Sequence, residues 1–185
     1  MESFLSDTHA REQIADVALG LDESGNFLSL DVKITANLGA HIGPSTIHPV
    51  VSNIGGITGV YDISASHVLV EGVFSNTQNV SPYRGAGRPE ATYIIERMID
   101  IAAEKMGFDK VELRRRNMIR PEQMPFKTGL VFTYDSGDFP GLLISPFNAA
   151  NRVGFDYPRM ARKSRSRQPG FGLAHPLDIS GWPKP

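Results

Sequence analysis

A short glycine-rich turn that opens a helix sets the strictest limit on how this chain can fold. It occupies residues 82–90 and reads PYRGAGRPE. Its two glycines permit positive φ angles and a close approach of the backbone to a ligand. Pro89 suits the first helical position, where the N–H that proline lacks would have no intrahelical partner. Free amides at a helix start, with two arginines beside them, favour an anion. The sequence therefore predicts an anion-binding loop.

The segments around this loop alternate between strand and helix patterns. Apolar residues recur at nearly every second position after Phe27, and turn formers at 22–26 separate this run from an earlier one, which predicts an antiparallel hairpin. Helical periodicity follows the loop and stops at Gly107. Without regular βαβ spacing, these patterns indicate an α+β fold. The expected strands are 13–21, 27–38, 67–74 and 171–179, with two short extended pieces around Gly129, and the expected helices are 47–54, 90–106, 109–117 (capped by Asp109) and one from Phe139 (capped by Asp138).

The helix over 90–106 is expected to turn one apolar face toward the core. The residues placed on that face are Ala91, Ile94, Ile95, Met98, Ala102 and Met106, and Glu96 is placed on the opposite, solvated side. Three consecutive arginines, 114–116, fall at the end of the following helix, where cations suit the helix dipole. We expect these three side chains to be solvated rather than to bind phosphate or a partner.

Composition excludes several classes of function. The 19 Lys and Arg nearly balance the 20 Asp and Glu, so no overall field favours nucleic acid or an anionic membrane. There is no cysteine, which excludes thiolate catalysis and cysteine-held metal clusters within these residues. The first residues lack a signal-peptide pattern, and no apolar run approaches the ~20 residues of a membrane span. We therefore expect a cytoplasmic protein without a membrane span.

Other motifs leave the anion loop as the main candidate. No Gly-Lys-Ser/Thr follows it, and Glu90 stands where a dinucleotide fingerprint has its third glycine. The alternative is a tight connection that binds no ligand. The flanking arginines and Tyr83 favour the anion-binding loop over this alternative. The five histidines lack zinc spacing, so no protein-held metal is expected. A basic segment at 159–167 could contact nucleic acid, but a solvated helix or a subunit contact is favoured.

Several motifs in one order resemble the molybdopterin-binding large subunit of molybdenum hydroxylases. This family includes xanthine dehydrogenase, aldehyde oxidase and aerobic carbon monoxide dehydrogenase. The resemblance extends over about residues 1–175. The motifs that carry it are Asp7–Arg11, Ala36–Ala40, Gly59–Ile63, Pro82–Glu96, Glu112–Asn117 and Thr133–Phe139.

The resemblance implies a cofactor and the residues that bind it. The cofactor would be molybdopterin cytosine dinucleotide, and the loop residues that line its site would be Tyr83, Arg84, Gly85, Ala86 and Gly87. Carbon monoxide dehydrogenases place a copper-binding cysteine at the position of Gly85. The glycine therefore points away from carbon monoxide and toward hydroxylation of an aldehyde or an N-heterocycle with oxygen derived from water.

The resemblance also implies that these residues form part of a larger enzyme. Residues 1–135 would be the first part of a molybdopterin-binding domain, with antiparallel strands followed by helices. Residues 136–185 would be a helical connection toward a second cofactor-binding half. FAD and 2Fe–2S centres would lie on partner subunits. The family's general base, a glutamate, has no counterpart here, so no catalytic residue is assigned and the isolated chain is expected to be inactive. The alternative is a non-catalytic anion- or nucleotide-binding module.

Overall fold

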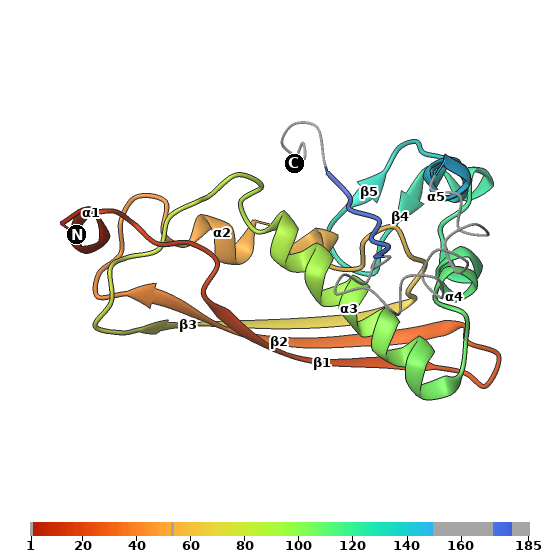
Figure 1. Cartoon of the computed structure of the whole chain (residues 1–185), viewed down its shortest axis with the longest axis horizontal. Coiled ribbons are helices and arrows are strands. Elements are labelled where there is room, and N and C mark those ends of the chain that lie inside the picture. The colour runs from red at the N-terminus through yellow and green to blue at the C-terminus, as the bar shows by residue number, and fades with distance from the viewer. Residues whose placement is uncertain (1, 53, 150–171, 179–185) are drawn as a thin grey trace, which may run out of the picture.

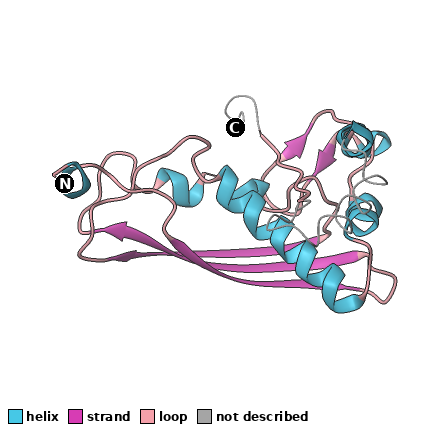
Figure 2. Ribbon diagram, in the orientation of Figure 1, coloured by secondary structure: helices cyan, strands magenta, loops and turns pink. Residues whose placement is uncertain are grey.

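The computed structural model describes residues 2–52, 54–149 and 172–178. Its largest sheet has three strands in the order β1-β2-β3 (Figure 1). Strand β1 (Gln13–Leu21) pairs antiparallel with β2 (Phe27–Gly39), as the hairpin pattern predicts. Strand β3 (Ala65–Phe74) lies parallel to β2 on its other side. The mixture of strands and helices confirms the α+β class (Figure 2).

One face of the sheet is buried, and the other is exposed and carries both polar and apolar side chains. The buried face follows the period-two pattern of β2, from which Leu30, Val32 and Ile34 enter the core. On the opposite face, Lys33 forms an ion pair with Glu71 at 3.0 Å, one strand away. This alternation is what an amphipathic sheet covered on one side requires.

A parallel pair needs a crossover, and residues 40–64 provide it. The crossover contains α2 (His48–Val51) and the 3-10 turn η1 (Ile54–Gly56), where the sequence predicts one short helix over 47–54. It ends on the buried residues Val60, Tyr61 and Ile63. Tyr61 also forms an isolated β-bridge to Met118, which joins the crossover to the segment after α4.

Helix α3 (Arg88–Met106) runs diagonally across the sheet (Figure 1). It begins at Arg88, so Pro89 is its second residue rather than its first, and it ends at Gly107, which has φ 77°. Ala91, Ile94, Ile95 and Ala102 are buried as predicted. Two assignments on this helix are wrong. Glu96 is buried because it pairs with a buried arginine of the next helix, and Met106 is 44% exposed in the last turn.

Helix α4 (Lys110–Asn117) begins as its cap predicts, because the Asp109 side chain accepts hydrogen bonds from the amides of Val111 and Glu112. Its last residue, Asn117, is buried and reaches the turn of the hairpin. The Asn117 side chain accepts from the Phe27 amide at 2.8 Å and donates to the Gly25 carbonyl at 2.9 Å. These bonds fix α4 to the end of the sheet.

The remaining elements are short. Residues around Gly129 form the predicted extended pieces, β4 (Phe126–Lys127) and β5 (Thr133–Tyr134), which pair antiparallel. Helix α5 (Phe139–Ala149) is capped by Asp138, whose side chain accepts from the Gly141 amide. The others are α1 (Ser3–Ser6) and the 3-10 turn η2 (Pro121–Gln123).

The prediction of a last strand is wrong for residues 172–178, which have no strand partner. Leu173 and Leu177 pack against the core instead, and Asp178 pairs with Arg88 at 2.8 Å. An apolar-alternating segment can bury its side chains without joining a sheet, and this one does so. The basic segment 159–167 lies outside the described residues. Within the described ranges, no helix is long and apolar enough to cross a membrane.

Candidate anion-binding loop

The loop ahead of α3 has an unusual backbone. Gly85, Ala86 and Gly87 have φ angles of 96°, 41° and 95° in succession. Positive φ is rare for a residue with a side chain, so Ala86 is held there by its surroundings. Two turn bonds do part of this: the Ala86 amide donates to the Tyr83 carbonyl at 2.7 Å, and the Arg88 amide donates to the Gly85 carbonyl at 3.0 Å.

The loop packs closely against the crossover. A Cβ at Gly87 would overlap the carbonyl oxygen of Pro49 in α2, so glycine is needed there for space as well as for conformation. The Ser52 hydroxyl, just after α2, donates a short hydrogen bond to the Ala86 carbonyl. The loop is therefore held from the side of α2 by contacts that the sequence did not predict.

Several donors of this loop are unused. Among the described residues, the main-chain N–H groups of Gly85, Gly87 and Glu90 make no hydrogen bond, although Gly87 is buried. The Arg84 side chain is exposed and likewise makes no hydrogen bond or ion pair within the described ranges. Buried amides are almost always paired in proteins, so unpaired ones at a helix start favour an anionic ligand.

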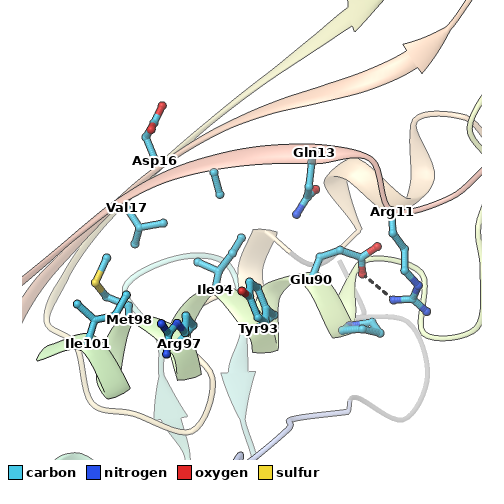
Figure 3. Close-up of a pocket in the computed structure, with 12 residues that line it drawn as sticks. Arg11, Gln13, Asp16, Val17, Glu90, Tyr93, Ile94, Arg97, Met98 and Ile101 are labelled. Carbon is cyan, nitrogen blue, oxygen red and sulfur yellow. Dashed lines mark hydrogen bonds and ion pairs between the residues drawn. The ribbon is translucent and has the colours of Figure 1, made fainter. Parts of the chain in front are cut away.

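A second arginine, distant in sequence, joins this loop. Arg11 lies just before β1, and its Nη2 donates to the Arg84 carbonyl at 2.5 Å. Its Nη1 lies 3.2 Å from the Glu90 carboxylate (Figure 3), and its guanidinium lies 5.1 Å from the centre of the Tyr83 ring. The sequence alone did not predict that Arg11 lies at this site. Its only signal was membership of the motif Asp7–Arg11.

A groove adjoins the loop between β1 and α3 (Figure 3). Its volume is about 590 Å³. Pro89 and Glu90 border it at the end nearest the loop, and Tyr93 and Arg97 line it along α3. Within the described residues Arg97 has no acidic partner, so the groove combines apolar walls with an unneutralised cation.

A buried ionic cluster fixes α3 against α4. Arg114, which was expected to be solvated, is 0% exposed and pairs with Glu96 at 2.8 Å and Asp100 at 3.0 Å. The Tyr61 hydroxyl donates to Glu96 at 2.7 Å. Burial by itself lowers the pKa of Arg114, but Glu96, Tyr61 and Asp100 together outweigh burial, so the pKa is raised. Burial raises the pKa of Tyr61, and Glu96 adds to that shift. From the sequence alone the three arginines look solvated, because the partners that bury Arg114 lie on another helix.

No protein-held metal site is evident in the parts of the chain that are described, since no three histidine, aspartate or glutamate side chains gather there. His175 is half-buried and stacks edge-on against Phe139 at 6.2 Å. Burial lowers its pKa. The loop itself offers anion donors, namely its unpaired amides and the Arg84 guanidinium.

Solved structures of other proteins share the fold of this chain. Quinoline 2-oxidoreductase from Pseudomonas putida 86 aligns with a TM-score of 0.82 and 28% identity, over 89% of this chain and 21% of its own. The structure of Cu,Mo-CO dehydrogenase aligns with a TM-score of 0.75 and 29% identity, over 85% of this chain and 20% of its own.

Curated relatives agree with these structures. The large chain of carbon monoxide dehydrogenase from Hydrogenophaga pseudoflava is 33% identical over 98% of this chain. Subunit gamma of the 6-hydroxypseudooxynicotine dehydrogenase complex from Paenarthrobacter nicotinovorans is 32% identical over 98% of this chain. The chain spans 23% of the length of each relative. The model of the molybdopterin cofactor-binding domain matches residues 1–118, which include the loop and α3. The chain therefore belongs to the molybdopterin cofactor-binding domain family and corresponds to part of the large subunit of molybdenum hydroxylases.

Proposed function

We propose that the loop Tyr83–Gly87 binds the molybdopterin cofactor of an oxidoreductase. The observation that carries this proposal is the set of unused donors on the loop, namely the amides of Gly85, Gly87 and Glu90 and the guanidinium of Arg84. Phosphate and oxo groups of the cofactor are acceptors that such donors suit. The family match over residues 1–118 favours this proposal over a general anion- or nucleotide-binding module.

The residues present fit the cofactor in chemistry. Gly87 is buried and its amide has no partner among the described residues, so it can donate to a ligand, and the exposed cation of Arg84 can pair with a phosphate. Tyr83 is 65% exposed, so its ring is available beside the loop. When bound, the cofactor would supply oxygen transfer and take up two electrons. The loop itself would bind and orient it, with molybdopterin cytosine dinucleotide as the proposed form.

The proposed substrate class rests on one residue of the loop. Gly85 stands where carbon monoxide dehydrogenases of this family carry a copper-binding cysteine, and the chain contains no cysteine. We propose that the complete enzyme hydroxylates an aldehyde or an N-heterocycle. Quinoline 2-oxidoreductase, whose name states a heterocyclic substrate, is among the similar structures. Iron–sulfur and flavin subunits would accept the electrons in the cytoplasm.

The isolated chain is proposed to bind cofactor without turning over substrate. Proton abstraction needs a base within hydrogen-bond reach of the reacting group, and we assign none among these residues. The missing three quarters of the relatives' length would provide it. Residues 1–135 would form the first part of the cofactor-binding domain, and residues 136–185 would lead toward the second half.

Molybdenum and cytidine nucleotide in the purified chain test this proposal. The chain would be produced in a host that makes molybdopterin cytosine dinucleotide, and both components would be measured per mole of chain. We expect both in the wild type and a clear loss in Arg84→Gln, whose side chain has no partner within the described residues to lose. Arg116→Gln on α4 is the matched control, because Arg116 is exposed and makes no ion pair with the described residues. Absence of both components from the wild type would contradict the proposal.

A further inference from the structure

We propose that Arg11 is a positioning residue that holds the cofactor loop in its binding shape before the cofactor arrives. The inference rests on the function proposed above, since it concerns the same loop. It adds a residue 72 positions before Tyr83 in the sequence. Arg11 reaches three parts of the loop at once: the Arg84 carbonyl, the Glu90 carboxylate and the Tyr83 ring.

These contacts join the two ends of the loop. Arg84 lies before the residues with positive φ, and Glu90 lies after them in the first turn of α3. One guanidinium therefore joins the two ends of the strained segment. Because Ala86 and Gly87 are also held by Ser52 and packed on Pro49, the segment is fixed from both sides.

Only arginine has the geometry for this task. Its planar fork can donate to two acceptors in different directions while its face lies against an aromatic ring. Lysine has one point charge and cannot span the carbonyl, the carboxylate and the ring together. The side chains of Arg11 and Glu90 are 32% and 12% exposed, so water screens their pair less than it would a fully exposed pair.

The backbone of Arg11 is in a strained conformation. Its φ of 62° lies in the left-handed region, which is uncommon for a residue other than glycine. Such strain persists where surrounding contacts determine the conformation. A loop ordered in advance loses less conformational entropy when a ligand binds, which raises affinity without adding a contact to the ligand.

The test uses Arg11→Lys and Arg11→Gln in the full chain, with hydrogen exchange measured by mass spectrometry without cofactor. We expect the hydrogen-bonded amides of the loop, those of Ala86 and Arg88, to exchange about tenfold faster in both variants, with little change in the melting temperature. Molybdenum content should fall in parallel. Arg115→Lys and Arg115→Gln are matched controls, because Arg115 pairs with Glu112 through two nitrogen–oxygen contacts at 2.8 Å on α4, away from the loop. They should leave exchange in the loop unchanged.

Two results would overturn the inference. One is unchanged loop exchange in both Arg11 variants. The other is an equal acceleration throughout the sheet and α3, with a lowered melting temperature, which would mean that Arg11 only stabilises the fold. Glu90→Gln should give an intermediate acceleration, since the contacts to Arg84 and Tyr83 remain. If no sample contains molybdenum but loop exchange still depends on Arg11, the cofactor proposal fails while the positioning role stands.

Discussion

Arg114 is a charged residue that lies fully buried, out of contact with water. Glu96 and Asp100 neutralise it, and Tyr61 adds a hydrogen bond to Glu96. A buried pair is a weak source of net stability, but removing one partner leaves the other charge buried and unpaired. Without Arg114, Glu96 would lack its counter-charge, whereas Asp100 would keep its ion pair with Lys110 at 3.5 Å.

Arg114→Met should accordingly cost about 3–5 kcal/mol of unfolding free energy. Replacing Glu96 by leucine at the same time should recover part of that loss, because the remaining buried charge is removed. Urea unfolding of both single variants and the double variant measures the coupling. A double variant whose loss equals the sum of the single losses would show that the two side chains act independently.

His175 gives the fold a dependence on pH. Burial depresses its pKa below the ordinary value of 6.5, so the folded state prefers the neutral ring while the unfolded state gains a proton more readily. The contribution of the neutral His175 ring to the unfolding free energy is complete above about pH 6.5. It is lost as the pH falls from there through the depressed pKa of the folded state. The negative charge of Glu96 opposes this shift and limits its size.

His175→Phe should therefore remove part of the acid sensitivity of the protein. The ring stack on Phe139 can be retained by phenylalanine, whereas the proton cannot. Unfolding free energies of the wild type and the variant at pH 7.5 and 5.5 test this. The gap between the two proteins should shift in favour of the variant at the lower pH, and a gap independent of pH would contradict the assignment.

At the scale of elements, the two glycines that flank α3 both have positive φ angles, so their substitution by alanine can be compared. Gly87 has φ 95° and no room for a Cβ against Pro49, whereas Gly107 has φ 77° and open space around it. Gly107→Ala should cost about 1–2 kcal/mol from backbone conformation alone. Gly87→Ala should cost more, because the loop or α2 must also move. Thermal unfolding and urea titration compare the two, and equal losses would mean that the contact with Pro49 is easily relieved.

The sequence could predict most elements because their signals are local. The period of two in β2, the Asp109 cap and the Gly107 stop each act within a few residues. The same is true of the loop, whose glycines and arginines are adjacent. Arg11 and Ser52 could not be assigned to the loop this way, because their contacts depend on how β1 and α2 pack. Burial of Arg114 escaped prediction for the same reason, and the parallel placement of β3 was set by the crossover rather than by its own pattern.

At the scale of the whole molecule, the three-stranded sheet has two open edges within the described residues. Neither β1 nor β3 pairs on its outer side. Apolar side chains are exposed on them: Ile14 on β1 at 72% and Phe74 on β3 at 63%. Strand edges without protection pair readily with other chains. The chain spans 23% of the length of the relatives it matches.

The isolated chain should consequently self-associate in a concentration-dependent way through its sheet. Ile14→Lys and Phe74→Lys should shift it toward the monomer, because a lysine on an edge strand opposes pairing. Phe4→Lys is the matched control, since Phe4 is 79% exposed but belongs to α1 outside the sheet. Light scattering after size-exclusion chromatography measures the mass of each variant across a dilution series. If the wild type stays monomeric at every concentration, or if Phe4→Lys alone dissociates it, the sheet edges are not the associating surface.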